Sequence, residues 1–319
     1  MTPSDVVVVV GAGLAGVACA RELRSAGVGV RVLDRGHRVG GRMASRRLWG
    51  LERATDLGAS YLTVTDPEFG AVVDGWAARG LAAPWTDAFC VLGEDEPRMT
   101  SGPTRWGALG GLRSLVEDVA SDLDVEKVEL ADVADLDGAA AVVLAMPDPQ
   151  AVRLCGDHPV AQLLTREWEP VLALAARWPE RTWDDLSPSG RFDGAFVNDD
   201  PAIGWVADDG RRRGDGAPVL VVHSTPELAA QHLADPSAAA PDLVAAVRRL
   251  MDLDEPADVH VHRWTFARPV GERAASYALV DGAGGPVGVC GDGWGPKPKV
   301  ETAWLSGARL GRELAVRFG

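Results

Sequence analysis

The feature that most constrains the fold is a glycine-rich turn that directly follows a run of valines near the start of the chain. Val6–Val10 lead into the motif Gly11-Ala12-Gly13-Leu14-Ala15-Gly16, and residues 17–26 have the composition of a helix. A second apolar segment then ends in Asp34. A strand, a glycine turn, a helix and a second strand form a parallel crossover unit. The sequence therefore predicts an α/β protein built on a parallel sheet.

Each position of the motif has a physical role in holding a dinucleotide phosphate. Gly11 permits the tight turn, Gly13 lets a pyrophosphate approach the backbone, and Gly16 lets the helix pack close to the sheet. Free N–H groups at the start of the helix face the anion. Asp34, about 20 residues beyond the first glycine, is placed to accept a hydrogen bond from a ribose hydroxyl. These roles predict a Rossmann-type dinucleotide-binding domain, with an ordinary glycine-rich turn as the alternative.

The loop after Asp34 favours FAD over NAD as the dinucleotide. In a nicotinamide-dependent dehydrogenase the second strand usually leads into another helical crossover, whereas here it meets residues 35–43, Arg-Gly-His-Arg-Val-Gly-Gly-Arg-Met. The adjacent glycines Gly40 and Gly41 would bring the backbone against a flavin dinucleotide. Arg42 would offer a planar fork of donors to its oxygens. A basic surface turn is the alternative interpretation.

This loop resembles the second FAD signature of the amine oxidase and phytoene desaturase superfamily, and the resemblance extends to the far end of the chain. There, an apolar strand over 287–292 ends in Gly291-Asp292, and a helix is expected to begin at Val300. In the superfamily the Gly-Asp pair places a carboxylate near the ribityl chain. The helix that follows aims its N-terminus at the flavin pyrimidine ring, where its dipole favours negative charge.

Within the superfamily the chain resembles the renalase-like flavoproteins. Four stretches carry this resemblance, and with the first glycine motif they span the chain: 40–47, 56–63, 262–269 and 291–307. The resemblance implies that four residues contact FAD, namely Ala15, Arg42, Ser60 and Tyr61. It also implies that the backbone of Val128 holds the adenine.

Together, the motifs and the resemblance predict one set of residues that binds FAD non-covalently. The set is Gly11, Gly13, Leu14, Ala15, Gly16, Asp34, Arg35, Gly41, Arg42, Met43, Gly58, Ala59, Ser60, Tyr61, Val128, Gly291, Asp292 and Val300. Covalent attachment through Cys290 is the alternative weighed and set aside, because this residue lies inside an apolar strand whose side chains pack.

The FAD-binding domain is expected to be discontinuous. It would combine residues 1–65, 106–150 and 282–319, and a mixed α+β substrate domain would be built from residues 66–105 and 151–281. The whole is the two-domain, amine oxidase-like architecture that the resemblance implies.

Local patterns predict several elements within these domains. A helix is expected over 109–123 and a strand over 125–130. In the substrate domain, the expected elements are strands over 171–176, 194–197 and 218–224, a helix opened by Thr225-Pro226-Glu227 and a helix over 241–251. Arg211–Arg213, flanked by Asp208, Asp209 and Asp215 in a glycine-rich stretch, is expected to be a solvated loop.

Composition excludes several classes of protein. The net charge of −14 argues against binding to nucleic acid or to an anionic membrane. No apolar run approaches the roughly 18 residues of a membrane span, and no leader with a cleavage site is visible, so a cytoplasmic protein is expected. The four cysteines are scattered and are expected to be buried thiols.

The residues that remain point away from metal or triad chemistry. His260 and His262 share one face of a strand, but two ligands without a third favour packing over a metal site. The only lysines, Lys127, Lys297 and Lys299, do not lie where amine oxidases place theirs. Arginines beside aromatic rings suit a pyrophosphate-bearing substrate. The resulting pocket candidates are Arg105, Trp264 and Arg268, although structural roles at strand ends would explain them equally well.

The resemblance implies an oxidase that converts the 2- or 6-dihydro isomers of NAD(P)H to NAD(P)+. A hydride would pass to flavin N5, and O2 would then be reduced to hydrogen peroxide. Loss of hydride alone restores aromaticity to a dihydropyridine, so no side-chain base is required. Two alternatives stay open, namely a flavin amine oxidase or desaturase acting on another small molecule, and a non-catalytic flavoprotein that serves as a scaffold or redox sensor.

Overall fold

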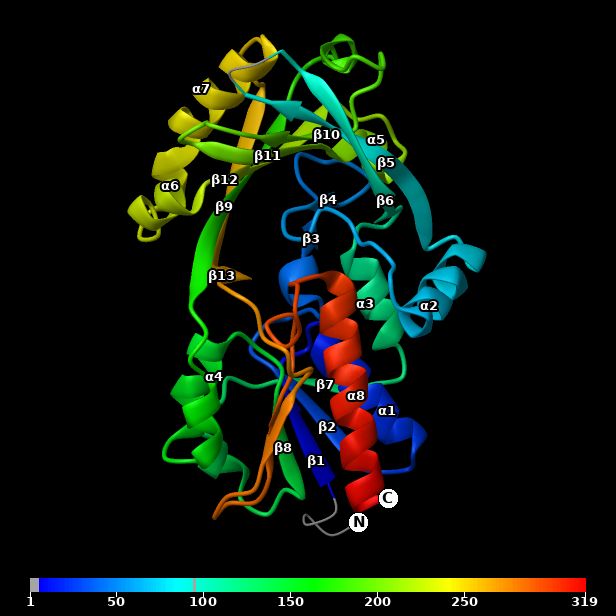
Figure 1. Cartoon of the computed structure of the whole chain (residues 1–319), viewed down its shortest axis with the longest axis vertical. Helices are drawn as coiled ribbons and strands as arrows, with labels where there is room; N and C mark the ends of the chain where they lie inside the picture. Colours follow the sequence, from blue (N-terminus) through cyan, green and yellow to red (C-terminus); the bar gives the residue numbers. More distant parts are fainter. Residues whose placement is uncertain (1–5, 94–95) are drawn as a thin grey trace.

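A computed structural model describes residues 6–93 and 96–319, which form two β-sheets with a two-stranded ribbon between them (Figure 1). The first sheet has the strand order β14-β15-β8-β1-β2-β7. All its neighbouring strands run parallel except β14, which is antiparallel to β15. The bounds are β1 Val6–Val10, β2 Gly29–Asp34, β7 Val125–Lys127, β8 Ala141–Leu144, β14 Ala278–Val280 and β15 Val287–Val289.

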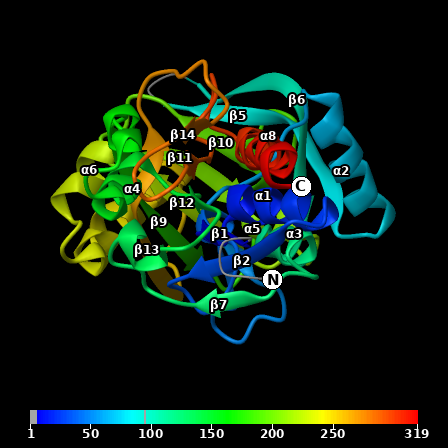
Figure 2. The same ribbon diagram turned by 90° about the horizontal axis from the view of Figure 1, so that it is seen from below.

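Helices cover both faces of the first sheet, as expected for a parallel sheet with buried valine strands. Figures 1 and 2 show α1, α3 and α8 on one face and α4 on the other. Glycines permit the close packing of α1 on α8, because a Cβ at Gly307 would lie 1.9 Å from the carbonyl oxygen of Ala15. The bounds are α1 Leu14–Ser25, α3 Arg113–Val119, α4 Asp148–Cys155 and α8 Val300–Phe318.

The second sheet has seven strands in the order β13-β9-β12-β11-β10-β5-β6. Its neighbours are antiparallel except β10 and β5. The bounds are β5 Ala82–Leu92, β6 Arg98–Ala108, β9 Trp168–Arg177, β10 Gly194–Val197, β11 Ile203–Asp208, β12 Val219–Ser224 and β13 Asp258–Pro269.

The two faces of the second sheet have different neighbours. Leu172, Leu174 and Val222 share a core with α6 (Pro226–Gln231) and α7 (Ala240–Met251). On the opposite face, Ala175 and Val221 pack against Leu57. The second face, called the inner face below, therefore looks towards the segment that follows the ribbon of β3 (Ser45–Arg46) and β4 (Thr55–Asp56). Helix α2 (Pro67–Ala78) lies at the side (Figure 1).

Most elements expected in and beside the second sheet are confirmed, including strand β10 and helix α6. Thr225 caps α6, and its side chain accepts from the N–H of Leu228. The helix expected over 109–123 is wrong in its limits, because α3 spans only Arg113–Val119. Gly111 has φ +82°, a left-handed conformation that delays the helix start. The strand expected over 125–130 is also shorter, ending at Lys127. Strand β14 belongs to the first sheet although it precedes residue 282.

Candidate functional site

The first glycine turn leaves no room for side chains at two of its positions. Gly11 has φ +109°, and a Cβ there would lie 2.6 Å from the carbonyl oxygen of Ala145. A Cβ at Gly16 would lie 1.9 Å from the carbonyl oxygen of Gly11. Gly13 differs, because only the Cα of Gly41 comes within 4 Å of a Cβ built there. The turn is therefore closed by Gly11 and Gly16 and leaves open space beside Gly13.

The carboxylate of Asp34 connects the two glycine loops. Its Oδ2 accepts from the N–H of Ala12 at 2.7 Å, and its Oδ1 accepts from the N–H of Gly36 at 2.6 Å. Gly40 donates its N–H to the carbonyl oxygen of Ala12 at 2.9 Å, which brings the second loop against the first. A carboxylate offers about four acceptor positions. Asp34 thus keeps capacity for a ribose hydroxyl.

Arg42 links the second loop to the C-terminal signature. Its guanidinium donates to both carboxylate oxygens of Asp292, at 3.0 and 2.6 Å, and lies 4.7 Å above the ring of Trp168. A bidentate pair of this kind fixes orientation as well as charge. Behind it, Gly291 has no atom within 4 Å of a built Cβ. Three signatures that lie far apart in the sequence therefore meet around one open region.

The segment Gly58–Tyr61 closes this region from the side of the second sheet. A Cβ at Gly58 would lie 1.9 Å from the carbonyl oxygen of Arg42, and Ala59 donates its N–H to the same oxygen at 2.9 Å. Ser60 is held by its hydroxyl, which accepts from Trp205 Nε1 at 2.9 Å. The ring of Tyr61 packs 5.5 Å from Phe89 within an aromatic cluster that also contains Trp85 and Trp205.

Other residues expected at the cofactor lie on the same elements. Val128 donates its N–H to the carbonyl oxygen of Asp34 at 2.9 Å, next to the first loop. Leu14 and Met43 are buried, Arg35 is exposed, and Val300 is the first residue of α8. The structure holds these positions around the loops, and their contact with a cofactor stays a prediction.

An acidic residue at the start of α8 that the sequence analysis did not single out anchors this helix. Glu301 is 6% exposed, and its Oε1 accepts from the N–H groups of Thr65 and Asp66 at 2.6 and 2.7 Å. The side chain of Asp66 in turn caps α2 by accepting from the N–H of Glu68. Glu301 therefore fixes α8 against the chain that enters α2. Its acidic position in the first turn of a helix was the available signal.

The expectation of a solvated loop at Arg211–Arg213 is wrong. Helix α5, Asp209–Arg213, occupies this segment, and Arg212 and Arg213 are 4% and 0% exposed. Asp208 caps the helix by accepting from the N–H of Arg211 at 2.8 Å. Asp209 pairs with Arg212 and Arg213, three and four residues later. The spacing of acid and base along one helical turn was the overlooked signal.

This buried cluster, which we call the buried joint, connects the second sheet to the segment Gly58–Tyr61. It consists of Asp56, Asp209, Arg212 and Arg213. Arg212 Nη1 donates to the carbonyl oxygen of Ser60 at 2.7 Å, and its Nε lies 3.7 Å from Asp56 Oδ2. Burial raises the pKa of Asp56 to about 6, although the charge of Arg212 opposes the shift.

The three pocket candidates lie in different surroundings. Trp264 on β13 donates its Nε1–H to the carbonyl oxygen of Leu57 at 2.7 Å, so it borders the segment Gly58–Tyr61. Arg105 is buried with its guanidinium 4.5 Å above the ring of Phe89, in the aromatic cluster. Arg268 is exposed on β13. The structure therefore brings Trp264 and Arg105 to opposite ends of the inner face and leaves Arg268 at its edge.

Two histidines flank a small residue on the inner face. Strand register pairs Ala173 of β9 with His223 of β12 and with His262 of β13. Such partners lie side by side on one face of a sheet. Burial and the charges of Arg268 and Arg212 lower the pKa of His223 to about 3, so its ring is neutral. Its Nε2 is buried without a hydrogen-bond partner among the described residues.

Positive charge also gathers at the β13 side of the inner face. Burial and the nearby Arg46 lower the pKa of His260, and Arg46 Nη1 lies 3.3 Å from its Nε2. Burial, together with Arg46, His260 and Arg113, lowers the pKa of His262 to about 4. Both rings are therefore neutral at pH 7. An acidic protein thus presents a locally basic surface beside Trp264.

All four cysteines are buried free thiols, as expected. Burial raises the pKa of Cys290 to about 12, which keeps the thiol protonated. Within the part of the chain that the structure describes, no three His, Cys, Asp or Glu side chains group as metal ligands. A search of the same residues for a helix with the length and apolarity of a membrane span finds none.

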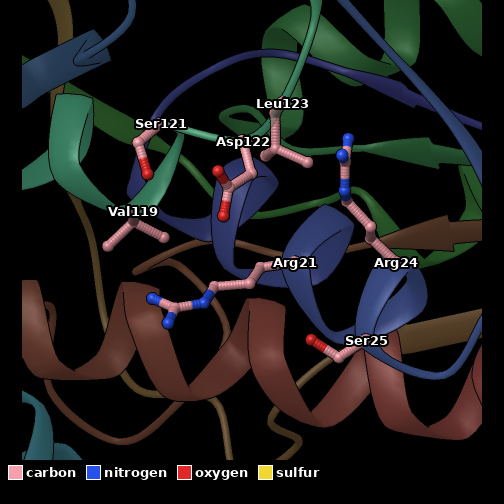
Figure 3. Close-up of a pocket in the computed structure, with 7 residues that line it drawn as sticks. All are labelled: Arg21, Arg24, Ser25, Val119, Ser121, Asp122 and Leu123. Atoms are coloured by element: carbon pink, nitrogen blue, oxygen red, sulfur yellow. The ribbon is translucent and has the colours of Figure 1, made fainter.

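A surface hollow of about 340 Å³ lies at the far end of α1 from the glycine turn (Figure 3). Its lining comes from the C-terminal half of α1, the end of α3 and the chain that follows α3, and consists of Arg21, Arg24, Ser25, Val119, Ser121, Asp122 and Leu123. None of the sequence motifs contributes to it, and we assign it no role in the site.

Comparisons with known proteins agree with the N-terminal motif. The family model of the NAD(P)-binding Rossmann-like domain matches residues 9–76 of this chain. The chain is 41% identical to protoporphyrinogen oxidase 2 of Arabidopsis thaliana over 73 residues. This stretch covers 23% of this chain and 14% of that protein. It is 49% identical to lysine-specific histone demethylase 1 homolog 2 of the same plant over 59 residues. This stretch covers 18% of this chain and 8% of that protein. The matches therefore span a small part of these longer relatives.

Solved structures match the chain over nearly its whole length. A putative protoporphyrinogen oxidase from Exiguobacterium superimposes with a TM-score of 0.74 at 14% identity, over 98% of this chain and 99% of that one. Cyclohexylamine oxidase from Brevibacterium oxydans gives 0.70 at 13% identity, over 98% of both chains. The chain has the fold of these oxidases. The expected α/β class and two-domain, amine oxidase-like architecture are thereby confirmed.

Proposed function

We propose that this chain is an oxidoreductase that binds FAD non-covalently between the two glycine loops. The open backbone at Gly13 and Gly291 suits the approach of a pyrophosphate, and Asp34 suits a ribose. The bidentate pair of Arg42 and Asp292 lies beside that region. The high pKa of the Cys290 thiol supports non-covalent binding. Bound FAD would supply hydride acceptance at N5 and reoxidation by O2 with release of hydrogen peroxide.

The proposed substrate is a 2- or 6-dihydro isomer of NAD(P)H, as in renalase-like flavoproteins. The observation that carries this proposal is the basic inner face around His260 and His262, with Arg46 and Arg113 beside it. A surface of this charge attracts the pyrophosphate of a dinucleotide and repels a protonated amine. The three lysines of the chain lie outside the second sheet, on β7 and before α8.

The chain's own residues would orient the substrate and shield it from water. Trp264 offers an indole face for a planar ring next to Gly58–Tyr61. His223 is neutral and buried beneath the inner face, so it adds no charge there. No proton needs to be removed from a dihydropyridine that loses hydride. The proposed oxidation therefore needs no general base.

A flavin amine oxidase acting on another small molecule is the second candidate. The cluster of Tyr61, Trp85, Phe89 and Trp205 favours it, because aromatic rings attract cations. Arg105 lies above Phe89 in the same cluster, however, and its charge opposes an amine there. The solved oxidases of similar fold include cyclohexylamine oxidase, which is named for an amine.

Anaerobic stopped-flow reduction tests the proposal. Purified protein is mixed with 2-dihydro-NAD, 6-dihydro-NAD, ordinary β-NADH or a panel of amines, and loss of flavin absorbance is followed. Fast bleaching by a dihydro isomer alone is expected. Bleaching by an amine alone would favour the second candidate, and a protein that stays yellow with every donor would favour a non-catalytic flavoprotein. The variant Gly16→Val, whose side chain cannot fit against Gly11, is expected to purify colourless.

A further inference from the structure

Two arginines that were not among the candidate site residues lie at the junction of the two sheets. Arg46 lies on β3, in the ribbon between the sheets, and its Nη1 is 3.3 Å from His260 Nε2 on β13. Arg113 is the first residue of α3, and its side chain lies against Gly40 of the second glycine loop. A Cβ at Gly40 would lie 3.1 Å from Arg113 Cγ and 3.3 Å from its Nε.

Both guanidinium groups lack an acidic partner within the part of the chain that the structure describes. Nearby arginines have one, since Arg38 pairs with Glu117 at 2.6 Å. Arg113 Nε is buried and makes no hydrogen bond there, although native proteins satisfy the great majority of buried polar groups. Burial and the charges of Arg38 and Arg46 lower the pKa of Arg113, and Glu117 and Asp56 offset only part of this shift.

We propose that Arg46 and Arg113 form an anion-binding subsite that holds the pyrophosphate of the dinucleotide substrate. The identity of this ligand rests on the function proposed above. An arginine fork matches phosphate oxygens in two directions, and two adjacent forks suit the doubly charged pyrophosphate group. A bound anion satisfies Arg113 Nε and removes the repulsion between the two side chains.

The subsite is connected to the flavin-binding segment by side chains that touch one another. His262 follows His260 on β13, and its ring centroid lies 4.5 Å from that of Trp264. Trp264 in turn donates to the carbonyl oxygen of Leu57, immediately before Gly58. The phosphate end and the ring end of one dinucleotide therefore have separate contacts on the same stretch of β13. His260 and His262, both neutral, can each donate one hydrogen bond to the ligand.

Titration of the FAD-loaded protein with ADP-ribose tests the subsite without any turnover. Isothermal calorimetry would compare wild type with Arg46→Gln and Arg113→Gln. The matched control is Arg31→Gln, since Arg31 pairs with Glu126 at the edge of the first sheet. Each test variant is expected to bind ADP-ribose about 10- to 100-fold more weakly, the range for losing one charge-assisted hydrogen-bonding group. The control is expected to bind as wild type does.

A further variant and a second ligand separate the possible causes. Arg113→Lys keeps the charge and loses the fork, and thermal melting of every variant verifies folding. Inorganic pyrophosphate is titrated in parallel with ADP-ribose, to distinguish a free anion from a dinucleotide. Tighter binding of ADP-ribose than of pyrophosphate supports the dinucleotide. Equal affinity for the two would overturn the dinucleotide assignment.

The remaining outcomes distinguish the subsite from the proposed function. Unchanged ADP-ribose affinity in both variants would overturn the subsite, even if dihydro isomers reduce the flavin. Loss of FAD on purification of the folded variants would also overturn it, because the arginines would then belong to the cofactor. If ADP-ribose binding depends on both arginines while no dihydro isomer bleaches wild type, the subsite stands and the proposed reaction fails. Lastly, KM for a dihydro isomer should rise in the variants, whereas KM for the corresponding dihydronicotinamide riboside should not.

Discussion

The buried joint and the subsite of Arg46 and Arg113 both contain two arginines, but the charges of these arginines are neutralised only in the buried joint. In the joint, Arg212 and Arg213 are nearly inaccessible, and Asp56 and Asp209 balance their two positive charges. In the subsite, two arginines stand together with neutral histidines and no acid partner among the described residues. The contrast teaches that burial with matched charge builds structure, whereas unmatched charge at a junction leaves a place for an anion.

Electrostatics explains why the two regions cannot exchange roles. A charge transferred from water to a protein interior loses several kcal/mol of solvation, which only close partners and hydrogen bonds offset. The joint meets this requirement, because Arg212 also donates to the carbonyl oxygen of Ser60. The subsite stays close to solvent and keeps its net charge available to a ligand.

The largest expected effect comes from removing one charge of the joint. Arg212→Met would leave Asp56 and Asp209 with too little positive charge in a buried site. Loss of one partner of a buried ion pair typically costs about 3–5 kcal/mol of unfolding free energy. Urea denaturation measures it, with Arg31→Gln as a surface control expected to cost no more than about 1 kcal/mol. Equal losses in the two variants would contradict the comparison.

A second prediction concerns pH and Asp56. In the unfolded chain its pKa is about 4, and burial raises the folded value to about 6. The folded state therefore binds more protons between these values, so this stabilising contribution is full below about pH 4 and is lost as pH rises through about 6. Wild type should lose up to about 3 kcal/mol relative to Asp56→Asn across that window, at about 1.4 kcal/mol per pKa unit. Denaturation at pH 4.5 and 7.5 measures the difference, and an opposite slope would disprove the assignment.

The subsite should respond differently to the same kind of substitution. Arg46→Gln and Arg113→Gln are expected to change the free energy of unfolding by no more than about 0.5 kcal/mol, or to raise it slightly, because mutual repulsion is relieved. Thermal and urea unfolding of the FAD-loaded protein would measure this. A loss as large as that of Arg212→Met would show that the two arginines are structural after all.

The smallest predicted effect is on the histidines of β13. The pKa of His262, about 4, is lowered first by burial and then by Arg46. In Arg46→Gln it should rise while staying below its ordinary value, because burial remains. NMR titration of the imidazole resonances follows both histidines. An unchanged His262 pKa would place Arg46 too far from β13 to form the subsite described.

The elements around the glycine motifs were predicted most accurately from the sequence. The strand before Gly11, the helix after it and the helix at Val300 all form as predicted. Local chemistry is enough for these, since a glycine turn between apolar segments has few alternatives. The helix over 109–123 was overextended, because composition does not reveal the left-handed conformation of Gly111.

Residues of the candidate site could be predicted from the sequence only where a single continuous segment contains the motif. Arg42 was expected to offer its donors to phosphate or flavin oxygens, and only the fold shows that Asp292, far along the chain, holds its guanidinium. Arg113 belongs to no recognised motif, and its proposed role depends on its neighbours Gly40 and Arg46, which lie on other segments. Such convergence cannot be read from spacing in a single sequence.

The sequence by itself determined the strand, glycine turn and helix of the Rossmann-like crossover and the parallel sheet that it belongs to, because backbone geometry and hydrophobic periodicity are local properties. The tertiary structure decided which charges are neutralised. Arg211–Arg213 looked solvated in the sequence, yet Asp209 and Asp56 draw two of these arginines into the interior. Solvation of a charge depends on everything packed around it, and the three-dimensional fold alone specifies those neighbours.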